Sequence, residues 1–207
     1  MLENYKIDEN GVIHQINYKP FDYSMEYNNK YNKYGENVKR MSHLRLGYLI
    51  GSIGYIPKSI LDVGVGNGDF IKCASSLVKE CYINDITKID IENTTWTDDL
   101  NIKVDVITMF DVLEHFENMD IISNFNCNYL ILSVPNCEYG YDDDWFINWK
   151  HRRPEEHFHH FNKDSLKKYV ESMGYSMINI TNIEDIIRKY DYVDVNILTS
   201  TFKKNYE

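Results

Sequence analysis

The chain has 207 residues, of which 43% are hydrophobic and 26% are charged, so it is long enough to form one globular domain with a buried core. Its formal net charge of −10 repels phosphate backbones and disfavours nucleic acid as a partner. No apolar run approaches the roughly 18 residues of a membrane span, and the polar start does not resemble a signal peptide, so we expect a cytoplasmic protein without a membrane partner. The composition does not indicate an oligomeric state.

Residues 1–35 are predicted to form an N-terminal extension. Asn10 and Gly11 lie between two short, half-apolar runs, and an Asn-Gly pair favours a β-hairpin because both residues accept a positive φ. The stretch 19–35 is rich in aromatic and poor in aliphatic side chains, which is typical of a cover rather than of a core. We therefore interpret residues 1–35 as a hairpin followed by a tyrosine-rich cover, and residues 36–207 as the main domain.

The main domain begins with a predicted helix over 38–53, which we expect Pro57 to end because proline lacks a backbone donor. From residue 59 onward, short apolar runs alternate with helical segments, as in a doubly wound α/β sheet. Apolar residues show little periodicity over 86–103, so the strand-and-helix unit expected there should be short. The predicted strands are 59–64, 81–85, 104–110, 128–135, 175–181 and 193–202, the last two antiparallel, and the further predicted helices are 69–80, 111–125 and 164–173.

A glycine-rich turn carries the sharpest functional signal. Gly64, Gly66 and Gly68 follow a predicted strand and precede a helix, where glycines let a ligand approach the backbone and the helix start offers free amide donors. A dinucleotide fingerprint needs its third glycine where this chain has Asp69, and the GK[ST] ending of a phosphate loop is missing. The turn therefore favours a nucleoside ligand without a pyrophosphate.

Asp85 supports this interpretation. It ends the second predicted strand, 17 positions after Gly68, where a carboxylate can accept both hydroxyls of a ribose. The alternatives are a solvated loop residue or a helix cap.

These segments resemble a known family. The runs LDVGVGNGDF, INDI, FDVLEHF, LILSVPN and EEHFHHFNKDSLKKYVESMGY, within residues 59–175, are similar in order and spacing to class I S-adenosylmethionine-dependent methyltransferases. The similarity is greatest to the small-molecule branch, which includes ubiquinone-biosynthesis and sugar O-methyltransferases. The resemblance implies a Rossmann-like, mostly parallel seven-stranded sheet with an antiparallel last strand.

The resemblance also implies roles for individual residues. Asp62 and the three glycines would hold the methionine end of S-adenosylmethionine, Asp85 its ribose, and Phe110 the turn beside the sulfonium. The acidic residue that often contacts the adenine in this family has only two candidates here, Asp98 and Asp99.

Methyl transfer to a hydroxyl needs a group that removes a proton, and histidine titrates near neutral pH. His157 is our first candidate for this base and His115 the second, although each could instead have a structural role. Neighbouring histidines on a loop seldom converge on a metal without acidic partners, so we expect no metal site from His157, His159 and His160.

Four residues are candidates for contacting the acceptor. Arg152 and Arg153 could bind a carboxylate or phosphate through their guanidinium groups, or form a solvated charged turn. His159 lies in the same insertion, and Tyr34 shares a helical face with Tyr27 and Tyr31, which forms either a lid or an ordinary packing face.

The sequence therefore predicts methyl transfer to a small molecule, at oxygen, with S-adenosylhomocysteine as product. The alternatives are an RNA- or nucleotide-modifying methyltransferase and a non-catalytic S-adenosylmethionine-binding partner protein.

Overall fold

The computed structural model describes residues 3–19, 35–140, 142–188 and 195–206. Apolar runs of the sequence form the strands of a central sheet, and those in its middle are buried on both faces. The sheet consists of β3 (Ser59–Val63), β4 (Glu80–Asn84), β5 (Thr95–Trp96), β6 (Val104–Phe110), β7 (Cys127–Pro135), β9 (Tyr175–Thr181) and β10 (Ile197–Lys204).

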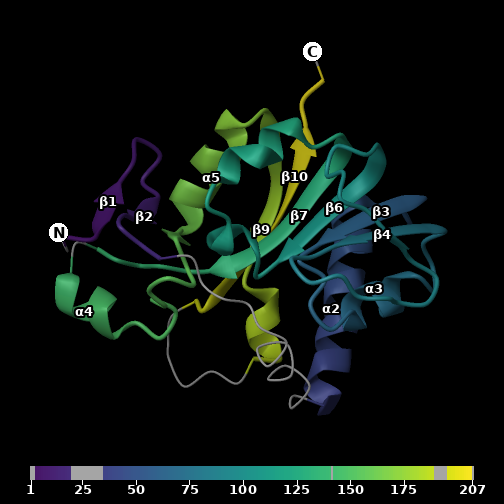
Figure 1. Cartoon of the computed structure of the whole chain (residues 1–207), viewed down its shortest axis with the longest axis horizontal. Helices are drawn as coiled ribbons and strands as arrows, with labels where there is room; N and C mark the ends of the chain where they lie inside the picture. Colours follow the sequence, from purple (N-terminus) through teal and green to yellow (C-terminus); the bar gives the residue numbers. More distant parts are fainter. Residues whose placement is uncertain (1–2, 20–34, 141, 189–194, 207) are drawn as a thin grey trace.

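The strand order is β5-β4-β3-β6-β7-β10-β9 (Figure 1). The first five strands in this order are parallel, whereas β10 is antiparallel to both β7 and β9. This arrangement confirms the predicted seven-stranded sheet with an antiparallel last strand. The third unit is short, as predicted: β5 has two residues.

Successive residues of the strands face two different cores, because side chains alternate between the faces of a sheet. On one face, Ile60 and Val106 pack against α2 (Gly35–Ile53) and α3 (Asp69–Ala74). On the other face, Leu61 and Ile107 pack against α5 and two short 3₁₀ helices. These elements are α5 (Lys163–Ser172), η2 (Leu113–His115) and η3 (Met119–Asn124). The domain therefore has three layers, with the sheet in the middle.

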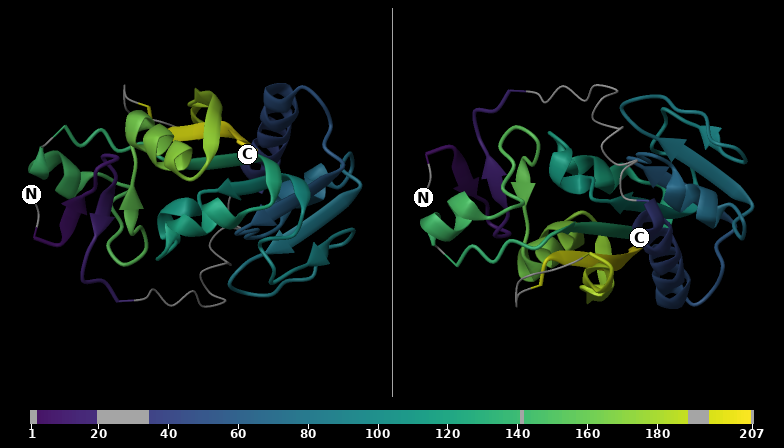
Figure 2. Two further views of the ribbon diagram at one scale, coloured as in Figure 1. Left: turned by 90° about the horizontal axis from the view of Figure 1, so that it is seen from above. Right: turned by 90° about the horizontal axis from the view of Figure 1, so that it is seen from below.

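A second, small sheet lies at one end of the molecule. The predicted hairpin is confirmed: β1 (Tyr5–Ile7) and β2 (Ile13–Gln15) are antiparallel, with Gly11 at φ 86° in the turn. The insertion after β7 adds β8 (His159–His160) to this sheet and also contains α4 (Asp143–Asn148). Strand β7 points toward the hairpin and α4, and α2 lies toward the opposite end (Figures 1 and 2). The division of the chain at residue 35 stays a prediction.

Two predicted helices differ from the structure. The segment 111–125 forms η2 and η3 instead of one helix, because Phe116 and Asn118 adopt extended conformations and Asn118 caps the second turn. Helix α3 ends at Ala74, and Glu80 belongs to β4.

Helix ends also differ in detail. Helix α2 ends at Ile53 through Gly54, whose positive φ reverses the chain before Pro57. Helix α5 starts one residue before the predicted 164 and is capped by Asn162, which forms a capping box with Ser165. No helix among the described residues is both long and apolar enough to cross a membrane.

A partly buried ion network ties α2 to the carboxyl end of β6. Arg45 of α2 donates to both carboxylate oxygens of Glu184, at 2.8 and 2.9 Å, and to Asp111 at 2.9 Å. Arg188 donates to the same two carboxylates. Two positive and two negative groups thus balance one another, as buried charges require. The network holds α2 and η4 (Ile183–Ile186) beside the edge of the sheet where β6 ends.

Candidate active site

The glycine turn follows β3 directly and is held by its neighbours. All three glycines have positive φ: 73° at Gly64, 55° at Gly66 and 79° at Gly68. A Cβ at Gly64 would lie 2.3 Å from a methyl carbon of Val112, and one at Gly68 would lie 2.3 Å from Ile91, whereas nothing lies within 4 Å of the corresponding position at Gly66. Gly64 is therefore required by packing, and Gly68 by its positive φ. Gly66 leaves open space above the turn, as a closely approaching ligand needs.

Asp85 lies against this turn, as the sequence predicted. Its Oδ2 accepts a hydrogen bond from the backbone amide of Gly66 at 2.9 Å, and its Oδ1 accepts one from Thr87 at 3.3 Å. A carboxylate has about four acceptor sites, so both oxygens can still accept further donors. The residues present therefore fit a ligand with two neighbouring hydroxyl groups.

Asp62 lies below the turn, inside the sheet. It is 3% exposed and accepts a 2.6 Å hydrogen bond from the Thr108 hydroxyl of the neighbouring strand β6. Burial raises the pKa of Asp62 to about 7, against the opposing effects of Thr108 and the positive charge of Arg45. Asp62 thus joins β3 to β6 at the point where the turn begins.

Phe110 is the last residue of β6 and is 8% exposed. Its ring packs edge-on against Phe70 of α3, and the Arg45 guanidinium lies 4.4 Å from its centroid. The backbone then turns sharply, since Asp111 has a φ of 58°. Phe110 therefore occupies the edge of the sheet beside the glycine turn.

The two adenine candidates are exposed and bonded locally. Asp98 accepts a hydrogen bond from the indole of Trp96 at 3.0 Å, and Asp99 accepts one from the backbone amide of Asn101 at 2.9 Å. A hollow of about 360 Å³ lies beside β4 and β5, and its lining residue Ile91 faces Gly68 of the glycine turn. It contains none of the predicted site residues and is lined by Ile83, Lys88, Ile89, Asp90, Ile91, Thr94 and Trp96.

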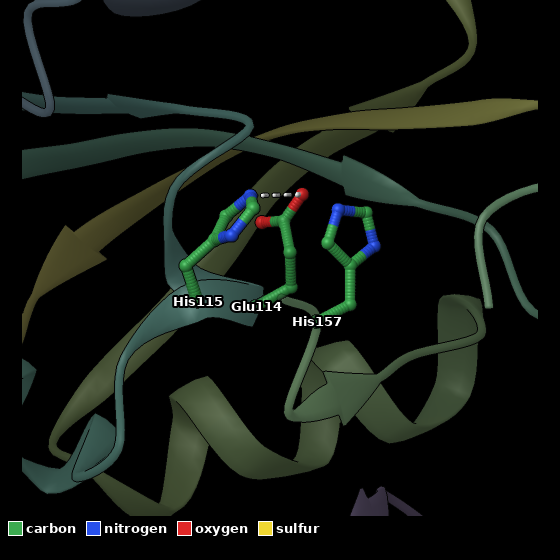
Figure 3. Close-up of side chains that lie close together, drawn as sticks. All are labelled: Glu114, His115 and His157. Carbon is green, nitrogen blue, oxygen red and sulfur yellow. Dashed lines mark ion pairs between the residues drawn. The ribbon is translucent and has the colours of Figure 1, made fainter. Parts of the chain in front are cut away.

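The structure brings His115 and His157 together. Their ring centroids are 4.5 Å apart, with Glu114 between them (Figure 3). One carboxylate oxygen of Glu114 lies 4.0 Å from Nε2 of His115 and faces a ring nitrogen of His157 as well. The ligand atoms of the three side chains lie within 4.8 Å of one another.

Backbone contacts fix this cluster. Glu114 and His115 belong to η2, directly after β6, and His157 comes from the insertion. The amide of Phe158 donates to the carbonyl of Glu114 at 2.8 Å, and the amide of His157 donates to the carbonyl of Arg153 at 2.8 Å. Two segments about 40 residues apart in the sequence are thereby held side by side.

Burial governs the charges in the cluster. Glu114 is 1% exposed, and burial together with the negative charge of Asp111 raises its pKa well above the usual range. Burial also lowers the pKa of His115 and, far more strongly, that of His157. Both imidazoles are therefore neutral at neutral pH.

The other predicted acceptor residues lie outside this cluster. The guanidinium carbon of Arg152 lies 5.5 Å from the ring centroid of Tyr5, and Arg153 forms a 2.9 Å ion pair with Glu156. His159 has structural partners: its Nε2 is 2.7 Å from the carbonyl of Phe116, and its Nδ1 is 2.8 Å from His14. Tyr34 lies outside the described residues. The roles of these four residues toward an acceptor stay predictions.

Sequence reasoning missed Glu114 and Arg45. Glu114 directly precedes His115 in the VLEH segment. A carboxylate next to a candidate histidine could have indicated that both belong to the site. Arg45 lies between Leu44 and Leu46 in the apolar part of its helix. A charged side chain at such a position could have indicated an ion pair with a buried partner.

The two halves of the site are direct neighbours. Strands β3 and β6 are parallel and adjacent, so their carboxyl ends meet at one edge of the sheet. Gly64 contacts Val112, which is two residues before Glu114. The glycine turn and the Glu114, His115 and His157 cluster therefore share one edge, as open α/β sheets generally arrange their ligand sites.

Substituting Gly64 should expose how tightly this edge is packed. Gly64→Ala is expected to lower the free energy of unfolding by about 2 kcal/mol or more, because the new Cβ meets Val112 and the φ is positive. Gly47→Ala, at an open position in α2, should raise it by about 0.5–1 kcal/mol. Urea denaturation measures both, and equal effects of the two variants would contradict the packing described here.

Asp62 should make stability depend on pH. Its folded pKa of about 7 lies above an unfolded value of about 3.9, so the folded state binds more protons between these values, and stability falls as pH rises through this range. From pH 5 to 8 this contribution amounts to about 2–3 kcal/mol, at about 1.4 kcal/mol per pH unit. Denaturation curves of Asp62→Asn should lack this decrease, whereas the exposed control Asp90→Asn should retain it. The same decrease in Asp62→Asn as in the unsubstituted protein would show that another group is responsible.

Comparison with known proteins adds the family. Residues 27–180, about three quarters of the chain, match the family model described as a methyltransferase domain. No curated protein matches the sequence.

Many solved structures share the fold. Magnesium protoporphyrin IX methyltransferase from Synechocystis, solved with bound S-adenosylhomocysteine, is 16% identical, with a TM-score of 0.61 over 88% of this chain and 95% of that one. A 1,6-didemethyltoxoflavin-N1-methyltransferase from Burkholderia thailandensis is 10% identical, with a TM-score of 0.60 over 98% and 100%. An S-adenosylmethionine-dependent methyltransferase from Clostridium acetobutylicum is 12% identical, with a TM-score of 0.61 over 87% and 98%.

The family match, the strand order and the glycine turn agree with the resemblance found in the sequence. The chain belongs to the methyltransferase-domain family and is a class I S-adenosylmethionine-dependent methyltransferase.

Proposed function

We propose that this methyltransferase transfers a methyl group from S-adenosylmethionine to an oxygen atom of a small-molecule acceptor. The observation that carries the proposal is the contact between the glycine turn and Val112, because it places the donor half of the site next to the polar cluster of Glu114, His115 and His157. A methyl donor on the turn and a hydroxyl at the cluster would then be neighbours.

The donor half consists of the glycine turn and Asp85. Open space at Gly66 admits the cofactor, and the Asp85 carboxylate accepts the two ribose hydroxyls while it keeps its bond to the Gly66 amide. Phe110 ends the adjoining strand β6 and would lie beside the methyl group. The sulfonium is already activated, so the protein has to hold the acceptor oxygen in line at about 3–3.5 Å and exclude water.

The acceptor half consists of the buried cluster. In a cluster without a metal ion, the neutral imidazole of His157 would accept the hydroxyl proton, with His115 as the second candidate. Nδ1 of His157 is buried and has no hydrogen-bond partner among the described residues. A polar cluster of this kind supports methylation at oxygen, where a proton has to leave.

Charge and contacts support a small acceptor. The net charge is −10, and Arg152 and Arg153 already have aromatic and acidic neighbours. Two of the structural neighbours are named as methyltransferases of magnesium protoporphyrin IX and of 1,6-didemethyltoxoflavin. No specific observation favours the nucleic-acid alternative.

Cofactor binding tests the donor half. Asp85→Ala should weaken S-adenosylhomocysteine binding by about 10- to 100-fold, because hydrogen bonds to a charged group are lost. Asp164→Ala changes an exposed aspartate of α5 and should bind like the unsubstituted protein. Isothermal titration calorimetry measures the affinities, and unchanged binding in Asp85→Ala would remove this residue from the cofactor site.

Turnover tests the acceptor half. His157→Ala should lower methyl transfer by about 10²- to 10⁴-fold with cofactor affinity retained, since the proton acceptor is lost. Transfer of labelled methyl groups from S-adenosylmethionine to a metabolite library measures the rate and identifies the acceptor. His43→Ala, at an exposed position in α2, is the matched control and should be fully active. An undiminished rate in His157→Ala would exclude a role for this side chain.

A further inference from the structure

Glu114 is a buried carboxyl group for which the general-base mechanism provides no hydrogen-bond or ion-pair partner. Its side chain is 1% exposed, and neither carboxylate oxygen has a hydrogen-bond partner among the described residues. A buried polar group without a partner costs about 1–3 kcal/mol, and a buried charge costs more. The nearby arginines are engaged elsewhere: Arg45 and Arg188 with Asp111 and Glu184, and Arg153 with Glu156.

We propose that Glu114, His115 and His157 bind a divalent transition-metal ion, with zinc as the best fit to these ligands. The donor set is one carboxylate and two imidazoles, and their ligand atoms lie within 4.8 Å of one another. Two histidines and one glutamate form a known type of catalytic zinc site, in which a fourth position stays open. Hard cations such as Mg²⁺ and Ca²⁺ prefer oxygen ligands, so this set disfavours them.

The side chains need only a small adjustment to reach metal geometry. Zinc–nitrogen and zinc–oxygen distances of about 2.0–2.2 Å place neighbouring tetrahedral ligands about 3.3–3.5 Å apart. The ligand atoms, now at most 4.8 Å apart, therefore have to approach by about 1.5 Å at most, which side-chain rotation can supply. Figure 3 shows that both imidazoles already direct a nitrogen toward the carboxylate of Glu114.

The backbone holds the ligands in place. Two are adjacent residues of η2, and the third is fixed by the hydrogen bond from the Phe158 amide to the Glu114 carbonyl. The His115 side chain is 18% exposed, which leaves a path from solvent to the cluster. The sequence disfavoured a metal site from His157, His159 and His160 because acidic partners were missing, and the fold supplies one from a different segment.

In methyl transfer, the metal ion would take over from a histidine general base the task of activating the acceptor hydroxyl. This step rests on the proposed function. An acceptor hydroxyl bound at the open position would have a lowered pKa and would lose its proton to water. The resulting oxygen anion attacks the methyl carbon, the carbon–sulfur bond breaks, and a neutral thioether leaves as S-adenosylhomocysteine. A histidine nitrogen that binds the metal cannot accept the proton, so the two roles of His157 exclude each other.

Metal titration tests the site without cofactor or acceptor. Protein treated with a chelator and then dialysed is titrated with ZnCl₂ in competition with a chromophoric chelator. We expect one equivalent to bind, and Glu114→Gln and His157→Asn to weaken this binding at least tenfold. Glu117→Gln, an exposed carboxylate three residues further along, and His43→Ala should both retain it.

Cobalt provides a readout that needs no variant. Co²⁺ bound by two imidazoles and a carboxylate should give visible absorption bands that disappear when Zn²⁺ is added. The proposal is wrong if these bands are absent, if no saturable binding occurs, or if Glu114→Gln and His157→Asn bind Zn²⁺ as well as the controls do. The zinc titration reports only on the metal site, whereas S-adenosylhomocysteine binding and labelled methyl transfer report on the proposed function. Failure of the metal site and failure of the proposed methyl transfer therefore give different results.

Discussion

The site depends on the parallel pairing of β3 with β6. This pairing brings the ends of the two strands to one edge, where Gly64 lies directly against Val112. Only a glycine fits there, since any Cβ would overlap the valine methyl groups. The same contact places the turn predicted to hold the cofactor within two residues of Glu114. Packing in the middle of the sheet thus positions two groups of functional side chains that come from separate parts of the chain.

Several polar groups along this edge are buried or partly buried, and they are stabilised in different ways. Asp62 is neutralised in part by burial and bonded to Thr108, and the two arginines of the ion network balance Asp111 and Glu184. Glu114 differs from these groups because no described side chain donates a hydrogen bond to it. Because both of its carboxylate oxygens lack a partner, Glu114 is the residue around which we place the proposed metal ion.

Local sequence patterns predicted the strands well and the segment after β6 poorly. The strands succeed because their apolar runs are buried on both faces, so periodicity and burial agree. The segment 111–125 has apolar residues at helical spacing, yet it forms two 3₁₀ turns because Leu113, Met119 and Ile122 have to pack against the sheet while Glu114 and His115 remain at its edge. Tertiary contacts outweigh helix propensity there.

The sequence by itself determined the order of the main strands, the glycine turn, Asp85 as its neighbour, and the family, because each of these depends on residues close together in the chain or on a linear order of motifs. Only the tertiary structure decided that His157 and His115 meet at Glu114, and that His159 and Arg152 have other partners. The physical reason is that the insertion reaches η2 through backbone hydrogen bonds across about 40 residues of chain, and no local pattern records which side chains such bonds bring together.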